Sequence, residues 1–338
     1  GPYMIDEWRT GDRVVMKRNP NYHWAPAFLH QDGPAHIETI VWRSIIEEAA
    51  LVAAFEAGEI DEIAVPAAQV QRFRDSGEYT MIEFLHNGVT FLEFNVTKAP
   101  FDDVKVRQAF NYAIDNTEVV EAALEGFGQP AYGFLPPSIW GYWEGIAEYA
   151  PKYDPEKAKS LLAEAGWTDS DGDGKLDKEG QPFVFTLYNL TFDSWQRAAQ
   201  VVQAQLEDIG IEMKIENYEF GTVLEKLKAG DHQMEMMGYT YTEPDIAYIW
   251  FDSSNIGNGL NFSHMNDPKL DELIAKGRST TDRAERAKVY EELQKYIVDL
   301  ALWVPLWVET NNYAFSKRLH NAQLHQDAYV VYFDAWVD

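Results

Sequence analysis

The spacing of hydrophobic residues predicts alternating strands and helices along most of the chain. Between residues 1 and 95, short runs rich in β-branched and aromatic residues predict strands, and one helix is expected over 47–57. Gly58 can supply the left-handed turn that ends this helix. Further along, the hydrophobic period changes, and amphipathic helices are expected over 102–114 and from 116 towards 126.

The middle of the chain carries the clearest helix signals. Asp154 can cap a helix, Pro155 suits its first turn, and Gly166 can end it. A strand then precedes a helix over 193–209, and a second strand follows over 211–218. This β-α-β order predicts a mixed α/β domain, with a right-handed crossover if the two strands are parallel.

Composition narrows the function classes. The 338 residues suffice for two domains, and the net charge of −27 disfavours nucleic acids and anionic membranes, which attract cationic surfaces. The absence of cysteine excludes disulfides, zinc thiolate sites and thiol catalysis. No apolar run reaches the roughly 18 residues that span a bilayer, and no signal-peptide pattern opens the chain, so this segment is not expected to insert into a membrane.

Enzyme signatures are missing from the sequence. It contains no nucleophile elbow, no Walker A loop, no zinc-protease helix and no dinucleotide-binding glycine motif after a strand. The eight histidines are scattered, and none forms a spaced metal-ligand pair on a helix. We therefore predict a protein that is not an enzyme. The alternative from another functional class is an enzyme, a hydrolase that binds oligomers.

One motif is typical of calcium loops. The segment 169–177 reads DSDGDGKLD, in which carboxylates at alternate positions could converge on one hard cation. The twelfth position is Gly180 instead of the bidentate Glu, so a plain polar turn is the other interpretation. No cofactor is expected apart from a structural calcium ion. The candidate ligands are Asp169, Asp171, Asp173 and Asp177.

Several motifs together resemble family 5 of the bacterial extracellular solute-binding proteins, the receptors for oligopeptides, dipeptides and nickel. They stand in family order along nearly the whole chain, although each is weak alone. They are GPY at 1–3, RNPNY at 18–22, AGEID at 57–61, PFDDVKVRQA at 100–109, AKSLLAEAGW at 158–167 and WVPL at 303–306.

The resemblance implies a periplasmic-binding-protein-like, type II-like α/β fold with two lobes. Residues 1–95 and 311–338 would form a partial first lobe with exposed sheet edges, and residues 96–310 a complete second lobe. The family's N-terminal part would be absent from this sequence. The implied function is the substrate-binding component of a bacterial ABC importer, with a membrane permease as its partner. The implied location is outside the cytoplasm, in the periplasm or at the cell surface, with a lipoprotein anchor as one form.

The ligand is expected in a cleft between the lobes, and the resemblance leaves its class open. Asn189 and Thr240 stand where peptide-binding relatives carry charged anchors, so blocked peptide termini should cost little affinity. A peptide-like solute and a neutral solute such as an oligosaccharide both remain candidates. Amphipathic aromatic rings and amides suit either ligand. The expected wall residues are Trp140, Tyr188, Asn189, Tyr239, Tyr241 and Asn261.

Overall fold

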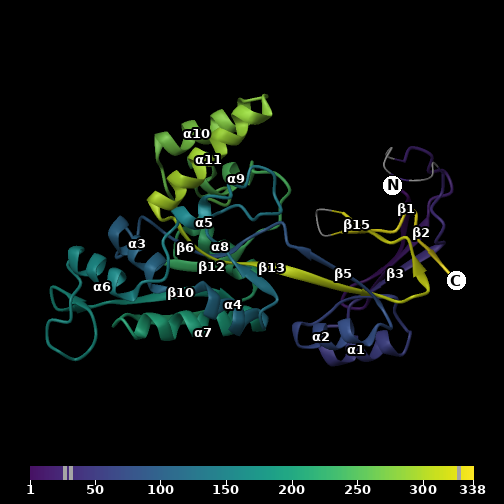
Figure 1. Ribbon diagram of the computed structural model, residues 1–338, viewed down its shortest axis with the longest axis horizontal. Helices are drawn as coiled ribbons and strands as arrows, with labels where there is room; N and C mark the ends of the chain where they lie inside the picture. Colours follow the sequence, from purple (N-terminus) through teal and green to yellow (C-terminus); the bar gives the residue numbers. More distant parts are fainter. Residues whose placement is uncertain (26–28, 30–32, 326–328) are drawn as a thin grey trace. The chain divides into compact units, whose positions relative to one another are not determined.

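The chain divides into two units in the computed structural model of Figure 1. The structure describes residues 1–25, 29, 33–325 and 329–338. The first unit comprises Gly1–Phe84 and Asn311–Asp338, and the second comprises Leu85–Thr310. The boundary predicted at residue 95 is therefore wrong, because strand β6 (Thr90–Phe94) pairs with strands of the second unit on both of its edges.

The first unit contains an antiparallel sheet, two helices and several shorter strands. Strands β1 (Tyr3–Arg9), β2 (Arg13–Arg18) and β3 (Thr39–Arg43) form the sheet in chain order. The other elements are α1 (Glu48–Glu56), β4 (Glu62–Ala64), α2 (Ala67–Ser76), β5 (Thr80–Leu85), β14 (Leu319–His320), β15 (Gln323–Leu324), β16 (Val330–Val331) and β17 (Trp336–Val337). β4 pairs with the last three residues of β13 (Trp303–Phe315), and β5 also pairs with β13.

The second unit contains a mixed sheet with the strand order β11-β10-β12-β6-β13. Strands β11 (Glu212–Tyr218) and β12 (Met234–Gly238) run parallel to β10 (Val184–Leu190), while β6 and β13 are antiparallel to their neighbours. Helix α7 (Asp193–Glu207) connects β10 to β11, which confirms the predicted β-α-β unit. Shorter strands are β7 (Gly128–Pro130), β8 (Asp177–Lys178) and β9 (Gln181–Pro182).

Helices cover both faces of this sheet (Figure 1) and build two cores. One core packs under α3 (Val104–Ala113), α4 (Asn116–Leu124), α6 (Pro155–Glu164) and α7. The other packs under α8 (Phe220–Ala229), α9 (Ile246–Phe251), α10 (Pro268–Ser279) and α11 (Arg283–Leu300). The remaining helices are α5 (Ile146–Tyr149) and the short 3₁₀ turn η1 (Ser253–Asn255). In the described part of the chain, no helix has the length and apolar character that crossing a bilayer requires.

Helix α6 forms where the local signals predict it. The Asp154 side chain accepts a hydrogen bond from the Lys157 N–H at 3.0 Å, and Pro155 occupies the first turn. Gly166 has a φ of 88°, a conformation that costs glycine little and other residues much. Ala158 and Leu162 are fully buried, so the capped helix contributes directly to the core.

Candidate ligand-binding site

A pocket of about 410 Å³ opens in the second unit at the ends of its strands. Leu190 closes β10, and Met237 and Gly238 close β12, so the pocket lies at the carboxyl ends of two parallel strands. Ligands of open α/β sheets commonly bind at this edge, where loops can vary without disturbing the sheet. The lining also includes His86, Gly88, Thr90, Phe192, Trp195, Phe220, Tyr239, Thr240 and Glu309.

A glycine makes the floor of this pocket possible. A Cβ added to Gly88 would lie 1.6 Å from the main-chain oxygen of Tyr239, so only glycine permits this close approach. The Tyr239 N–H donates to Val89 O at 3.3 Å, and the Tyr241 N–H donates to Asn87 O at 2.8 Å. These bonds continue the β6–β12 pairing beyond the strands and fix the segment that follows β12.

One histidine and one glutamate line the pocket. His86 Nε2 lies 2.8 Å from Thr240 Oγ1. The main-chain N–H of His86 donates to the main-chain oxygen of Glu309 at 2.8 Å. Burial lowers the pKa of His86, which favours the neutral imidazole at neutral pH. Burial raises the pKa of Glu309, because its carboxyl has lost part of its hydration. Glu309 is nevertheless the acidic residue among those that line the pocket, and a bound cation would pair with its carboxylate and favour the ionised form.

Aromatic rings supply the apolar part of the lining. Phe192 precedes the first turn of α7 and is 57% exposed, and Phe220 begins α8 and is 56% exposed. The Phe192 ring lies 5.7 Å from that of Trp195, at an interplanar angle of 69°. Large apolar side chains that stay this exposed at a concave site offer contact area to a ligand.

Only some of the predicted wall residues reach this pocket. Tyr239 lines it, and its hydroxyl donates to Phe134 O, which leaves the ring as its contribution to the lining. Thr240, which stands at the predicted anchor position, also lines the pocket. Tyr241 follows directly and is 36% exposed, but it is not part of the lining. Tyr188 lies elsewhere, with its ring 5.1 Å from Tyr218.

Three other predicted residues have structural contacts instead. Asn189 and Asn261 have no exposed surface. The Asn189 amide donates to Asn217 Oδ1 at 3.1 Å, and the Asn261 amide donates to three main-chain oxygens. Trp140 is half-buried and lies beneath the guanidinium of Arg283, 5.0 Å from its ring centre. The structure therefore does not bring these three to the pocket, because their side chains hold the second unit together.

Sequence reasoning missed most of the lining. Glu309 carried the best signal, because it is the first charged residue after the fully apolar run Trp303–Val308 and lies within the same strand, β13. Phe192 and Phe220 each stand at a helix start, where an exposed aromatic ring gives the helix no core contact. His86 gave no comparable signal.

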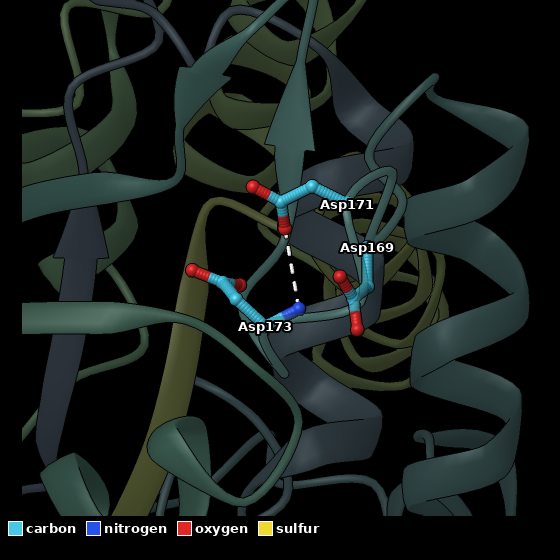
Figure 2. Close-up of side chains that lie close together, drawn as sticks. All are labelled: Asp169, Asp171 and Asp173. Atoms are coloured by element: carbon cyan, nitrogen blue, oxygen red, sulfur yellow. Dashed lines mark hydrogen bonds between the residues drawn. The ribbon is translucent and has the colours of Figure 1, made fainter.

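The acidic loop brings three of its four aspartates together. Oxygen atoms of Asp169, Asp171 and Asp173 lie within 4.8 Å of one another, and all three side chains are exposed (Figure 2). Asp169 accepts hydrogen bonds from the Gly172 and Gly174 N–H groups at 2.7 and 3.0 Å. The fourth aspartate, Asp177, is outside the cluster.

Asp177 instead fixes the start of the loop. Its Oδ2 accepts hydrogen bonds from both the N–H and the hydroxyl of Ser170, at 3.0 and 2.6 Å. These bonds stabilise the carboxylate and lower the pKa of Asp177. A cation at the cluster would therefore have Asp169, Asp171 and Asp173 as its side-chain ligands.

The family profile described as "Bacterial extracellular solute-binding proteins, family 5 Middle" matches residues 1–259. The chain belongs to this family. The family description names proteins that bind solutes. The strand-end pocket in a mixed α/β lobe is the arrangement on which such a binding function can rest.

Curated relatives and solved structures agree with this assignment. The oligopeptide-binding protein AppA of Bacillus subtilis is 30% identical over 339 residues, which cover 99% of this chain and 61% of AppA. The dipeptide-binding protein of Escherichia coli is 30% identical over 305 residues, covering 89% of this chain and 54% of that protein. The heme-binding protein A of Haemophilus influenzae is 31% identical over 310 residues, covering 90% of this chain and 53% of that protein.

The structural match confirms the fold class. The solved structure of AppA from Bacillus subtilis in complex with a nonapeptide has a TM-score of 0.85 and 29% identity, and the match covers all of this chain and 66% of that one. The chain thus spans about two thirds of the AppA structure. The predicted family 5 fold, present in part, is confirmed.

Proposed function

We propose that this protein binds a peptide or peptide-like solute and delivers it to an ABC importer. The observation that carries the proposal is the pocket at the ends of β10 and β12, in which a single carboxylate, Glu309, stands among aromatic rings. Similarity to oligopeptide-binding and dipeptide-binding proteins supports the same ligand class. The partner would be a membrane permease, and the protein would be located outside the cytoplasm.

The chemistry of the lining favours a ligand with a cation beside an apolar group. A peptide amino terminus supplies the ammonium, which can pair with Glu309, and the first side chain supplies apolar surface for Phe192 and Phe220. His86 does not compete for the carboxylate, because its lowered pKa keeps the imidazole neutral at neutral pH. A neutral oligosaccharide could stack on the rings but would leave Glu309 without a partner.

Capping the peptide amine therefore provides the test. With a tripeptide selected from a panel for tight binding, N-acetylation should weaken binding about tenfold or more, since a charge-assisted hydrogen bond contributes roughly 1.5–3 kcal/mol. The sequence alone predicts a small effect, because the anchors that it considers, Asn189 and Thr240, are uncharged. Titration calorimetry measures the difference directly.

A matched variant separates Glu309 from other contacts. Glu309→Gln should bind the free tripeptide about as weakly as the original protein binds the acetylated one, and acetylation should then have little further effect. Glu216→Gln, a change in a carboxylate of β11 that does not line the pocket, is the control. Tight binding of an oligosaccharide, together with indifference to acetylation, would exclude the peptide proposal.

We also propose a structural calcium ion for the acidic loop. Asp169, Asp171 and Asp173 already converge in an exposed turn, and Gly172 and Gly174 adopt the positive φ angles that its sharp bends need. Millimolar calcium should raise the melting temperature by mass action, and chelator should reverse the rise. Asp171→Ala should abolish the response, whereas the exposed Asp208→Ala should retain it. A melting curve indifferent to calcium would leave the loop as a plain turn.

A further inference from the structure

Several aromatic rings of the second unit lie beneath a cation of the protein itself. Lys295 Nζ lies 4.1 Å from the ring centre of Trp143. The guanidinium carbon of Arg278 lies 3.7 Å from the ring centre of Tyr248. The electron-rich face of an aromatic ring attracts a cation, so these ring faces are already satisfied within the protein.

The rings of the strand-end pocket have no such cation. In the part of the chain that the structure describes, no lysine or arginine lines the pocket or lies over one of its rings. Glu309 adds a carboxylate to the lining, so the pocket offers electron-rich ring faces and a negative charge together. A ligand that completes this set supplies a cation. The rings concerned are those of Phe192, Trp195, Phe220 and Tyr239.

Two of these rings are held by packing, and two are exposed. The Trp195 ring lies 6.5 Å from that of Trp307, at an interplanar angle of 85°. The Tyr239 ring is fixed through its hydroxyl, which donates to a main-chain oxygen. Phe192 and Phe220 are more than half exposed, at 57% and 56%. All of them belong to the second unit, which therefore presents both fixed and accessible ring surface to one ligand group.

We propose that the pocket recognises the ammonium of its ligand by charge, so that a methylated or quaternary ammonium binds there as well as a primary one. The inference rests on the proposed function and extends its ligand class to N-methylated peptides and similar cations. A primary ammonium has three N–H donors, and Glu309 is the one carboxylate among the described residues that line the pocket. Each methyl group replaces a donor that needs an acceptor with apolar surface that the rings can cover.

Methylation of a peptide amine tests the inference, because it adds bulk and keeps the charge. With the full gene product and the tripeptide of the capping experiment, the N,N,N-trimethylated form should bind as tightly as the free amine, to within about threefold. The N-acetylated form is also bulkier than the free amine but is uncharged, and it should bind at least about tenfold more weakly. Titration calorimetry compares the three ligands.

The outcomes separate this inference from the proposed function. A loss of about tenfold or more with both modifications would overturn the inference, because the pocket would then require the N–H donors, and it would leave the proposed function standing. Unchanged binding with both modifications would contradict the inference and the proposed function together, because neither charge nor donors would then be recognised.

A variant without two of the rings tests their part in recognition. Phe192→Leu combined with Phe220→Leu keeps apolar side chains at both positions and removes the aromatic faces. It should weaken binding of the trimethylated tripeptide about threefold or more and leave binding of the acetylated one nearly unchanged. Tyr153→Leu removes a half-exposed ring outside the pocket and is the control. Equal losses for the two ligands would overturn the inference, because the rings would then supply apolar contact alone.

Discussion

The free energy of unfolding should fall steeply as the pH rises from about 4.5 to about 8, and two buried carboxyl groups should account for much of the fall. Glu93 on β6 lies directly opposite Glu235 on β12, and neither side chain has any exposed surface. Burial raises the pKa of Glu93 to about 8 and raises that of Glu235 well above its usual range. The proximity of Glu93 raises the pKa of Glu235 further.

The direction of the pH effect follows from these raised pKa values. In the unfolded chain both carboxyls ionise near pH 4.5, whereas in the folded protein they keep their protons. Their stabilising contribution is therefore complete below pH 4.5 and is lost as the pH rises through the folded pKa. The loss is about 1.4 kcal/mol per pH unit for each carboxyl that stays protonated, on the order of 4–5 kcal/mol for Glu93 by pH 8.

Neutral substitutions isolate this contribution. Glu93→Gln and Glu235→Gln should each make the protein more stable than the original at pH 8, with a much smaller difference at pH 4.5, in urea unfolding. Glu164→Gln is the control, because Glu164 is exposed and Lys105 lowers its pKa. If the glutamine variants lose stability with pH as steeply as the original, the buried pair does not remain protonated in the folded protein.

Removing Arg107 should produce the second large effect, a loss of about 3 kcal/mol or more of unfolding free energy. Arg107 is 3% exposed, and its guanidinium donates to the main-chain oxygens of Phe101, Leu300 and Ala301 at 2.8–3.3 Å. It thereby satisfies carbonyls at the end of α11 and opposes the negative end of that helix. Desolvation lowers its pKa to about 10, so it stays charged at neutral pH.

Arg107→Ala leaves those carbonyls buried without their donor. Urea unfolding at pH 7 compares it with Lys105→Ala, a change on the same helix. Lys105 is exposed and forms only a surface ion pair with Glu164 at 3.0 Å, so its loss should cost within about 1 kcal/mol. Equal effects of the two substitutions would contradict the role given to Arg107.

Local signals explain how much of the fold was predictable. Helix α6 has its cap, its proline and its terminal glycine within the sequence, and the β-α-β unit has long periodic segments. Helix α2 escaped notice because only Val70 and Phe73 are buried along its ten residues, which leaves too short an apolar stripe to recognise. The boundary near residue 95 depended on the sheet partners of β6, and pairing with distant strands leaves no local mark.

The candidate site was less predictable, for a reason of geometry. Successive residues of a strand point to opposite faces, and sequence alone does not say which face a polar residue takes. Asn189 on β10 therefore looked like a ligand contact, although its amide is bonded inside the second unit. Tyr239, which directly follows the buried strand β12, was among the predicted wall residues, whereas Thr240 was predicted only as an uncharged residue at the position of an anchor.

Native mass spectrometry of the full gene product, purified from its own organism without unfolding, tests the central claim most directly. We expect a bound species that is released on activation and fragments as a peptide with a free amino terminus, and its share should fall in Glu309→Gln. A bound oligosaccharide, lost equally from the original and the variant, would contradict the account.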